Sequence, residues 1–175
     1  MRIIAGSRKG HKIDAPPGRR TRPTSDRVRE NVFNLVQPWI GDATVLDLFA
    51  GSGAMGIEAL SRGAERAVFV EAGAQACRVI DRNLEKLRLT GARVYQSDVP
   101  RFLATDRGTY DLIFCDPPYD EYAALEPTLA RYVPRLLAED GLVVLETAAR
   151  TEPHLPLTER TSRRYGAARI TLFEA

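Results

Sequence analysis

The sequence predicts an α/β fold with a mostly parallel sheet that is covered by helices on both faces. From residue 44 onward, short apolar runs alternate with segments of helical periodicity, which is the pattern of βαβ units. The runs are apolar at consecutive positions, as in strands that are buried on both faces. Near the C-terminus two strand-like runs, 159–165 and 168–174, are separated by Gly166 with no helix between them. This pair predicts an antiparallel hairpin at an edge of the sheet.

The elements of the sheet region follow from runs of β-branched and aliphatic residues for strands and from apolar residues three or four positions apart for helices. In chain order we expect a strand over 44–49, a helix over 54–62, a strand over 66–71, a helix over 73–89, a strand over 93–97, a helix over 99–105, a strand over 110–116, a helix over 122–137 and a strand over 141–146. We treat residues 42–175 as the main domain and residues 1–41 as an extension of it.

The extension is basic. Residues 1–31 have a net charge of +6, whereas the whole chain has +2, so the extension suggests a polyanionic partner. Short extended runs on either side of Gly6 and Gly10 predict a small hairpin. Apolar residues from Val28 to Ile40 then recur at helical spacing and predict an amphipathic helix that ends near Gly41. A second basic group, formed by Arg160, Arg163 and Arg164, is weaker evidence for such a partner.

Length and composition are those of one ordinary folded domain. The chain has 175 residues, 44% of them hydrophobic and 27% charged, which is enough for one sizeable core. No apolar run approaches the roughly 18 residues of a membrane span, and the first residues lack the pattern of a secretory signal. We therefore expect a cytoplasmic protein without membrane contact. The absence of a heptad seam predicts no obligate oligomer.

Metal chemistry is not expected. The two cysteines, Cys77 and Cys115, lie in apolar runs, and together with His11 and His154 they form no ligand set at zinc spacing. Both cysteines are expected to be small buried hydrophobic residues.

The first strand leads into the segment Asp47-Leu-Phe-Ala-Gly-Ser-Gly-Ala-Met-Gly56. Its glycines permit a tight turn and a close approach of a nucleotide to the backbone. Glu71 ends the second strand, where a carboxylate can accept hydrogen bonds from ribose hydroxyls. Both features suit a nicotinamide dinucleotide as well as an adenosyl cofactor. Asp47 favours the second, because a carboxylate attracts a sulfonium and an ammonium and repels a pyrophosphate.

Asp98 follows the third strand and has two interpretations. It can accept a hydrogen bond from the exocyclic amine of an adenine, or it can form the N-cap of the helix over 99–105.

The segment Asp116-Pro117-Pro118-Tyr119 follows a buried strand and therefore lies at the carboxyl edge of the sheet, where open α/β folds bind ligands. Two consecutive prolines fix the backbone and remove two N–H donors. A corner that is rich in acceptors and poor in donors suits an amine. Hydrogen bonds from a nucleobase NH2 to the Asp116 carboxylate and the Pro117 carbonyl would free the nitrogen lone pair for attack on a methyl group, and Tyr119 can stack on the base.

These segments resemble a known family. The glycine segment is similar to motif I of class I S-adenosylmethionine-dependent methyltransferases, and Asp116-Pro-Pro-Tyr119 is similar to the motif IV of amino-methyltransferases. The run from Arg22 to Glu30 and the opening Arg2-Ile3-Ile4-Ala5-Gly6 resemble the RsmD family, which methylates N2 of one guanine in small-subunit ribosomal RNA. The resemblance covers nearly the whole chain. It implies a Rossmann-like fold whose seven-stranded sheet has an antiparallel last strand, preceded by a small hairpin and a helix.

The resemblance also implies the roles of site residues. The catalytic residues would be Asp116, Pro117, Pro118 and Tyr119. The binding site for S-adenosyl-L-methionine would include Asp47, Phe49, Gly51, Gly53, Glu71, Asp98 and Val99. The contacts to RNA would come from Arg8, Lys9, Lys12, Arg19, Arg20, Arg22, Thr24 and Arg27. Thr24 has a second interpretation as a helix cap.

The implied substrate is 16S ribosomal RNA, within an assembling small ribosomal subunit, because one small domain with one basic arm has few means of recognising sequence. Several alternatives remain open. The same pocket fits guanine N2 in 23S ribosomal RNA, adenine N6, or DNA. A nicotinamide-dependent oxidoreductase and a non-catalytic RNA-binding module are the alternatives from other classes of protein.

Overall fold

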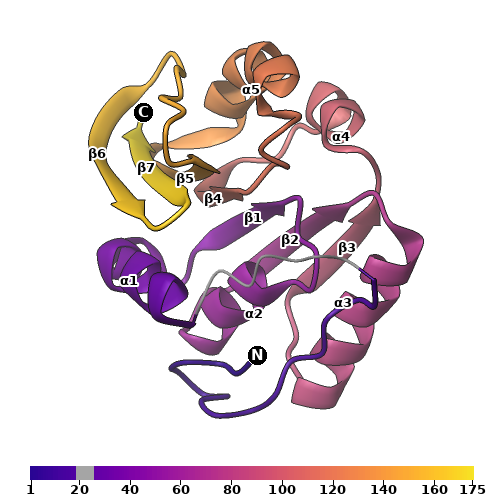
Figure 1. Cartoon of the computed structure of the whole chain (residues 1–175). Helices are drawn as coiled ribbons and strands as arrows, with labels where there is room; N and C mark the ends of the chain where they lie inside the picture. Colours follow the sequence, from indigo (N-terminus) through magenta and orange to yellow (C-terminus); the bar gives the residue numbers. More distant parts are fainter. Residues whose placement is uncertain (19–25) are drawn as a thin grey trace.

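A seven-stranded sheet with the order β3-β2-β1-β4-β5-β7-β6 forms the centre of the protein (Figure 1). The computed structural model describes residues 1–18 and 26–175. The strands are β1 (Thr44–Leu48), β2 (Arg66–Glu71), β3 (Ala92–Gln96), β4 (Tyr110–Cys115), β5 (Leu137–Ala148), β6 (Thr158–Tyr165) and β7 (Ala168–Glu174). The α-helices are α1 (Asp26–Val36), α2 (Ala54–Ser61), α3 (Ala74–Leu87), α4 (Val99–Thr105) and α5 (Tyr122–Leu136).

Strands β1 to β5 are parallel, and β7 is antiparallel to both β5 and β6. This confirms the expected sheet with its antiparallel hairpin at one edge. From β1 the chain builds β2 and β3 on one side and then returns to build β4 and β5 on the other side. The loops after β1 and β4 therefore diverge, and open α/β sheets bind ligands at this switch point.

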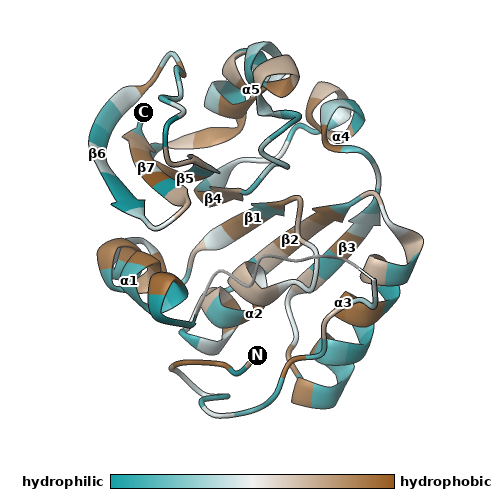
Figure 2. Cartoon of the chain, in the orientation of Figure 1, coloured by the Kyte–Doolittle hydropathy of each residue, from teal (hydrophilic) through white to brown (hydrophobic). Residues whose placement is uncertain are grey.

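Two hydrophobic clusters cover the two faces of the sheet. One joins β-strand side chains to α1, α2 and α3, and the other joins them to α4 and α5. Figure 2 shows this pattern as brown strands in the interior and teal positions on the outer sides of the helices. Ile3, Ile13 and Phe33 belong to the first cluster, so the described parts of the expected extension over 1–41 share a core with the sheet.

The expected N-terminal hairpin is present and short. Among the described residues, its arms are joined by one antiparallel bridge between Arg2 and Lys12 and by three backbone hydrogen bonds, from Ile3 to His11, from Gly10 to Ile3 and from Ile13 to Met1. The segment bonds to α2 instead of extending a ladder: the N–H groups of Ile4 and Ala5 donate to the carboxylate of Glu58. The backbone donors that a longer hairpin needs are therefore used elsewhere.

Two element boundaries differ from expectation by more than two residues. The first helix ends at Val36 and continues as a 3₁₀ turn over Gln37–Trp39, because Pro38 has no N–H and its ring clashes with the carbonyl four residues earlier. Strand β5 begins at Leu137, four residues early, because Leu137 already pairs with Tyr110 ahead of an irregularity in the register. The bounds expected for β2 and α4 are confirmed to the residue.

Candidate active site

The register of the sheet brings several predicted site residues to one level at its carboxyl edge. Leu48 in β1 pairs with Val70 in β2 and with Cys115 in β4, and Cys115 pairs with Leu145 in β5. The residue that follows each of these partners stands at the next level. Those residues are Phe49, Glu71, Asp116 and Glu146.

The turn after β1 has an uncommon backbone. Phe49, Gly51 and Gly53 have φ angles of 61°, 57° and 80°. A phenylalanine in the left-handed region is strained, and such strain is concentrated at functional sites. A Cβ at Gly53 would come within 3.2 Å of Ile57 and Ile80, so a side chain there would require these residues to shift by a few tenths of an ångström. The lack of side chains at Gly51 and Gly53 lets a ligand approach the backbone of this turn closely.

Glu71 connects two loops at this edge. Its side chain is 2% exposed, Oε2 accepts a hydrogen bond from Gly51 N–H at 2.9 Å, and Oε1 accepts one from Gly73 N–H at 2.8 Å. Its backbone carbonyl accepts from Ser97 N–H at 3.0 Å, which ties the loop after β3 to the same place. Glu71 therefore sets the relative position of the loops that follow β1, β2 and β3.

Asp47 lies behind the glycine turn. The residue is 3% exposed, and Oδ2 accepts a hydrogen bond from Gly56 N–H in the first turn of α2 at 2.9 Å. Burial raises the pKa of this carboxyl to about 7. We expected Asp47 at the edge of the pocket, and the structure has it buried beneath that edge. Near neutral pH this carboxyl is therefore partly protonated and partly ionised.

Asp98 forms the N-cap of α4. Its Oδ1 accepts a hydrogen bond from Arg101 N–H at 2.8 Å, which confirms the capping interpretation. The side chain is exposed at the carboxyl edge of the sheet, so the cap and an adenine contact are compatible. Val99, the first residue of α4, is buried next to it.

The segment Asp116 to Tyr119 leaves the end of β4. Asp116 and Pro118 are exposed, whereas Pro117 is buried. The hydroxyl of Tyr119 donates to Oε1 of Glu146 at 2.9 Å, and Glu146 is only 9% exposed. This bond holds the tyrosine ring near the end of β5.

Glu146 is a site residue that we did not expect from the sequence. A signal was present, because Glu146 ends the apolar run of β5 just as Glu71 ends that of β2. A carboxylate that ends a buried parallel strand lies at the ligand-binding edge in both cases.

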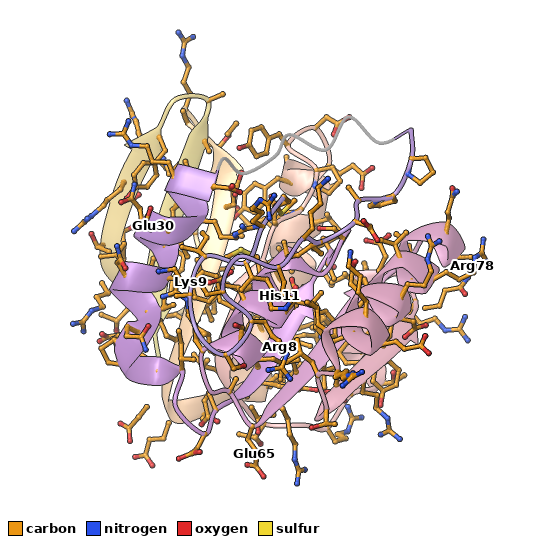
Figure 3. The ribbon with its side chains drawn as sticks, turned by 90° about the horizontal axis from the view of Figure 1, so that it is seen from below. Arg8, Lys9, His11, Glu30, Glu65 and Arg78 are labelled. Atoms are coloured by element: carbon orange, nitrogen blue, oxygen red, sulfur yellow. The ribbon has the colours of Figure 1, made fainter. Side chains whose placement is uncertain are left out.

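The basic residues predicted to contact RNA have different environments. The guanidinium of Arg8 donates to the backbone carbonyls of Leu87 and Arg88 at the end of α3, so it caps that helix. Lys9, Lys12 and Arg27 are exposed. Figure 3 shows Arg8, Lys9 and His11 together on the N-terminal loop. The remaining predicted contacts lie outside the described residues: Arg19, Arg20, Arg22 and Thr24.

Arg29 is a buried cation in α1. It is 1% exposed, and it donates to the carbonyl of Arg2 and to Oδ1 of Asp26. Burial lowers the pKa of this guanidinium, while the nearby carboxylate of Glu58 raises it. Arg29 therefore helps to hold the N-terminal segment against α1.

Among residues 1–18 and 26–175, no group of three or more histidine, cysteine or acidic side chains could hold a metal ion. Cys77 and Cys115 are buried free thiols, as expected. In the same part of the chain, no helix combines the length and the hydropathy that a membrane crossing needs.

Residues 1–174 match the model of the family described as Conserved hypothetical protein 95. The chain is 45% identical over 152 residues to "Putative rRNA methyltransferase YlbH" of Bacillus subtilis (strain 168), with coverage of 83% of this chain and 82% of the relative. It is 40% identical over 148 residues to "Ribosomal RNA small subunit methyltransferase D" of Escherichia coli (strain K12), with coverage of 84% and 74%.

A solved structure described as "Putative methyltransferase yhhF from Escherichia coli" has a TM-score of 0.85 and 34% identity, with coverage of 100% of this chain and 98% of that one. The fold extends to a more distant structure, described as "a putative methyltransferase complexed with SAH", at a TM-score of 0.72 and 19% identity, with coverage of 85% of this chain and 48% of that one. The observed sheet order and these likenesses identify a Rossmann-like class I methyltransferase fold.

Proposed function

The chain belongs to the family described as Conserved hypothetical protein 95, the RsmD family, and we propose that it methylates N2 of one guanine in 16S ribosomal RNA. It is a methyltransferase that depends on S-adenosyl-L-methionine. Its relatives include a protein named for the small ribosomal subunit, which supports 16S ribosomal RNA as the substrate.

One observation carries the proposal. Leu48 and Cys115 are paired in neighbouring parallel strands. The glycine turn, residues 49–53, begins immediately after Leu48, and the double-proline corner, residues 116–119, begins immediately after Cys115. A ligand on the glycine turn would therefore adjoin a base in the corner. Parallel strands are about 4.8 Å apart, which is compatible with direct transfer between two bound molecules.

The residues at this edge fit the cofactor. The turn over 49–53 offers backbone without an intervening side chain at its glycines, and the carboxylates of Glu71 and Asp98 are acceptors for a ribose and an adenine amine. Asp47, when ionised, supplies a negative potential beneath the turn. The bound cofactor supplies a methyl group on a positively charged sulfur. These side chains orient it and favour its positive charge over a pyrophosphate.

The double-proline corner would hold the guanine. The Asp116 carboxylate and the Pro117 carbonyl accept hydrogen bonds from the N2 amine, which draws its lone pair out of conjugation with the ring. Pro117 and Pro118 keep these acceptors in a fixed orientation, since neither residue has an N–H to form competing bonds. Tyr119 stacks on the base and is itself held by Glu146. After transfer, the surplus proton of the amine leaves through Asp116 or solvent, so positioning accounts for most of the catalysis.

A guanine inside a helix cannot reach this corner, so the target must lie in a loop or be flipped out. Lys9, Lys12 and Arg27 are exposed and can contact phosphates, and the same role is proposed for Arg19, Arg20, Arg22 and Thr24. Such contacts carry little sequence information, which favours the preformed surface of an assembling small subunit in the cytoplasm as the substrate.

The proposal is tested with labelled S-adenosylmethionine, protein-free 16S and 23S ribosomal RNA, unmethylated small subunits and DNA, followed by nucleoside mass spectrometry. We expect N2-methylguanosine in small subunits. Asp116→Asn should lower kcat by at least about 100-fold, because it removes the charged acceptor for the amine. Asp120→Asn is the matched control, since Asp120 is an exposed aspartate just beyond the corner, and it should keep the parent rate. Methyladenosine as the product, or methylation of 23S RNA or DNA in place of small subunits, would contradict the proposal.

A further inference from the structure

We propose that the end of the edge strand β6, with Arg163 and Arg164, and the first turn of α1, with Arg27, bind the phosphate backbone of the substrate RNA next to the target nucleotide. The inference rests on the proposed function, because it names the surface by which the same site holds its substrate. It assigns a role to the C-terminal basic group and adds a second RNA contact surface, separate from the N-terminal loop.

The end of β6 lies at the carboxyl edge of the sheet, where the glycine turn and the double-proline corner begin and which we call the catalytic edge. β6 is antiparallel to β7, and β7 is antiparallel to β5, so β6 ends at the same edge as the parallel strands. Glu146 pairs with Ile170, and Ile170 pairs with Arg163. Arg163 therefore lies at the level of Asp116, three strand spacings or about 14 Å away along the sheet. The RNA backbone next to a base in the corner can span that distance.

Arg163 and Arg164 are available to a ligand. Both residues are exposed, and within the described ranges no acidic side chain forms a salt bridge with either of them. Two other arginines of the hairpin differ. Arg160 bonds to Glu174 and lies 5.2 Å from the ring of Trp39, and Arg169 lies 3.8 Å from Glu152. Arg160 and Arg169 thus have acidic partners, whereas Arg163 and Arg164 at the catalytic edge are exposed.

The position of Arg164 favours an anion. Arg164 and Arg169 are directly opposite each other in β6 and β7, and like charges in such a pair are destabilising. Arg169 Nη2 is buried without a hydrogen bond among the described residues, and its acidic neighbour, Glu152, is 3.8 Å away. A phosphate beside this pair would relieve the repulsion. Because side chains alternate along a strand, Arg163 faces the opposite side, so the two arginines flank the open edge of β6.

Arg27 reaches the same edge from α1. Trp39, just beyond this helix, donates to the carbonyl of Asp140 near the start of β5, and Phe33 lies 5.5 Å from Phe114 near the end of β4. α1 thus runs from the carboxyl edge towards the amino edge, and its first turn, with Arg27, stands at the catalytic edge. Figures 1 and 3 show α1 beside the β6–β7 hairpin.

This surface is separate from the N-terminal loop. Arg8 and Lys9 lie on a loop that bonds to Ser61, the last residue of α2, and to the carbonyls of Leu87 and Arg88 at the end of α3, so the loop lies towards the amino edge of the sheet. The surface on β6 and α1 lies at the carboxyl edge, beyond the double-proline corner from the glycine turn. Basic side chains there would orient the RNA backbone next to the corner without reading its sequence.

The test compares four full-length proteins: the parent, Arg163→Gln with Arg164→Gln, the same variant with Arg27→Gln added, and a control with Arg66→Gln and Arg93→Gln. The control removes the same charge from exposed arginines at the starts of β2 and β3, at the opposite edge of the sheet. Equilibrium binding to protein-free 16S RNA and to unmethylated small subunits is measured over a series of potassium chloride concentrations. KM and kcat are measured on the subunits, and affinity for S-adenosylhomocysteine is measured by calorimetry.

We expect the β6 variant to raise KM for subunits by about tenfold with kcat unchanged, and to reduce the salt slope of RNA binding by about 0.7 for each arginine. Adding Arg27→Gln should reduce the slope by a similar step. The control should match the parent in KM and slope, and all variants should keep the parent affinity for S-adenosylhomocysteine, which excludes misfolding.

Parent values of KM and salt slope in the β6 variant would overturn the inference, as would an equal loss in the control. A loss of affinity for subunits with unchanged binding to protein-free RNA would also overturn it and would assign the β6 edge to a ribosomal protein. Dimerisation of the variant with unchanged RNA affinity would mean that the arginines only prevent edge pairing. Failure of the proposed function is distinct: the parent itself would then transfer no methyl group, while the binding measurements would still decide the role of β6.

Discussion

At the scale of single residues, carboxylates at or near the ends of buried strands organise the candidate site by accepting hydrogen bonds from backbone N–H groups. Glu71 holds Gly51 and Gly73, and Asp47 holds Gly56. A carboxylate buried in this way has an altered pKa unless its hydrogen bonds offset the loss of solvent. For Asp47 the cost of burial exceeds the effect of its hydrogen bond, so this residue titrates near neutral pH.

Asp47 therefore gives a prediction about stability. Its pKa is about 7 in the fold, against 3.8 for an ordinary aspartate, so the native state binds this proton more tightly than the unfolded chain. The stabilisation is complete below pH 3.8 and is lost as the pH rises towards 7. Asp47→Asn keeps an acceptor for Gly56 N–H but does not titrate. Between pH 4 and pH 8 the unfolding free energy of the parent should therefore fall relative to that of the variant, by at most about 4 kcal/mol.

Urea unfolding of both proteins at several pH values checks this prediction. Curves of unfolding free energy against pH that remain parallel would show that the carboxyl of Asp47 has an ordinary pKa in the native state.

At the scale of elements, the N-terminal loop is bound to α2 by a buried carboxylate and a close approach of backbones. Glu58 is fully buried, accepts from the N–H groups of Ile4 and Ala5, and also pairs with Arg62 at 2.9 Å. Gly6 then passes so close to α2 that a Cβ would stand 1.8 Å from the carbonyl oxygen of Ser61. The docking of the loop therefore requires glycine at this position.

Two glycine substitutions test the docking. Gly6 and Gly10 have nearly the same φ, +83° and +81°, but a Cβ at Gly10 would meet nothing within 4 Å. Gly10→Ala should cost only the strain of the left-handed backbone, about 1–2 kcal/mol. Gly6→Ala adds the clash with Ser61, so we expect a larger loss of stability in urea and faster hydrogen exchange at Ile3 and Ile13. Equal effects of the two substitutions would contradict the docking.

At the scale of the whole molecule, the sheet order creates one ligand-binding edge to which loops from distant parts of the chain contribute. The turn after β1 and the corner after β4 are about 70 residues apart in sequence, yet they leave neighbouring strands. A ligand that contacts several of these loops binds the folded chain but not the unfolded chain, so it must stabilise the fold.

S-adenosylhomocysteine at about 100 times its Kd should raise the unfolding free energy by about 2.7 kcal/mol, which is about 5–10 °C in Tm for a chain of this size. NADH should produce no shift, because the buried Asp47 disfavours a pyrophosphate on the glycine turn. Differential scanning fluorimetry with both ligands checks this. Stabilisation by NADH alone would support an oxidoreductase instead of a methyltransferase.

Much of the fold could be predicted because it depends on local patterns. The bounds of β2 and α4, the glycine turn and the double-proline corner follow from burial periodicity and from the φ/ψ limits of glycine and proline, which act over a few residues. The basic character of the N-terminal segment also follows from composition alone.

Only the tertiary structure decided which side chains meet across the chain. It bonds Arg8 to Leu87, bonds Tyr119 to Glu146, and leaves Arg164 opposite Arg169 at an open edge. The same kind of long-range contact keeps the N-terminal hairpin short, since the N–H groups of Ile4 and Ala5 donate to Glu58 in α2. A hydrogen bond or an ion pair requires two groups within a few ångströms, and for residues far apart in sequence that distance is set by the packing of the whole chain.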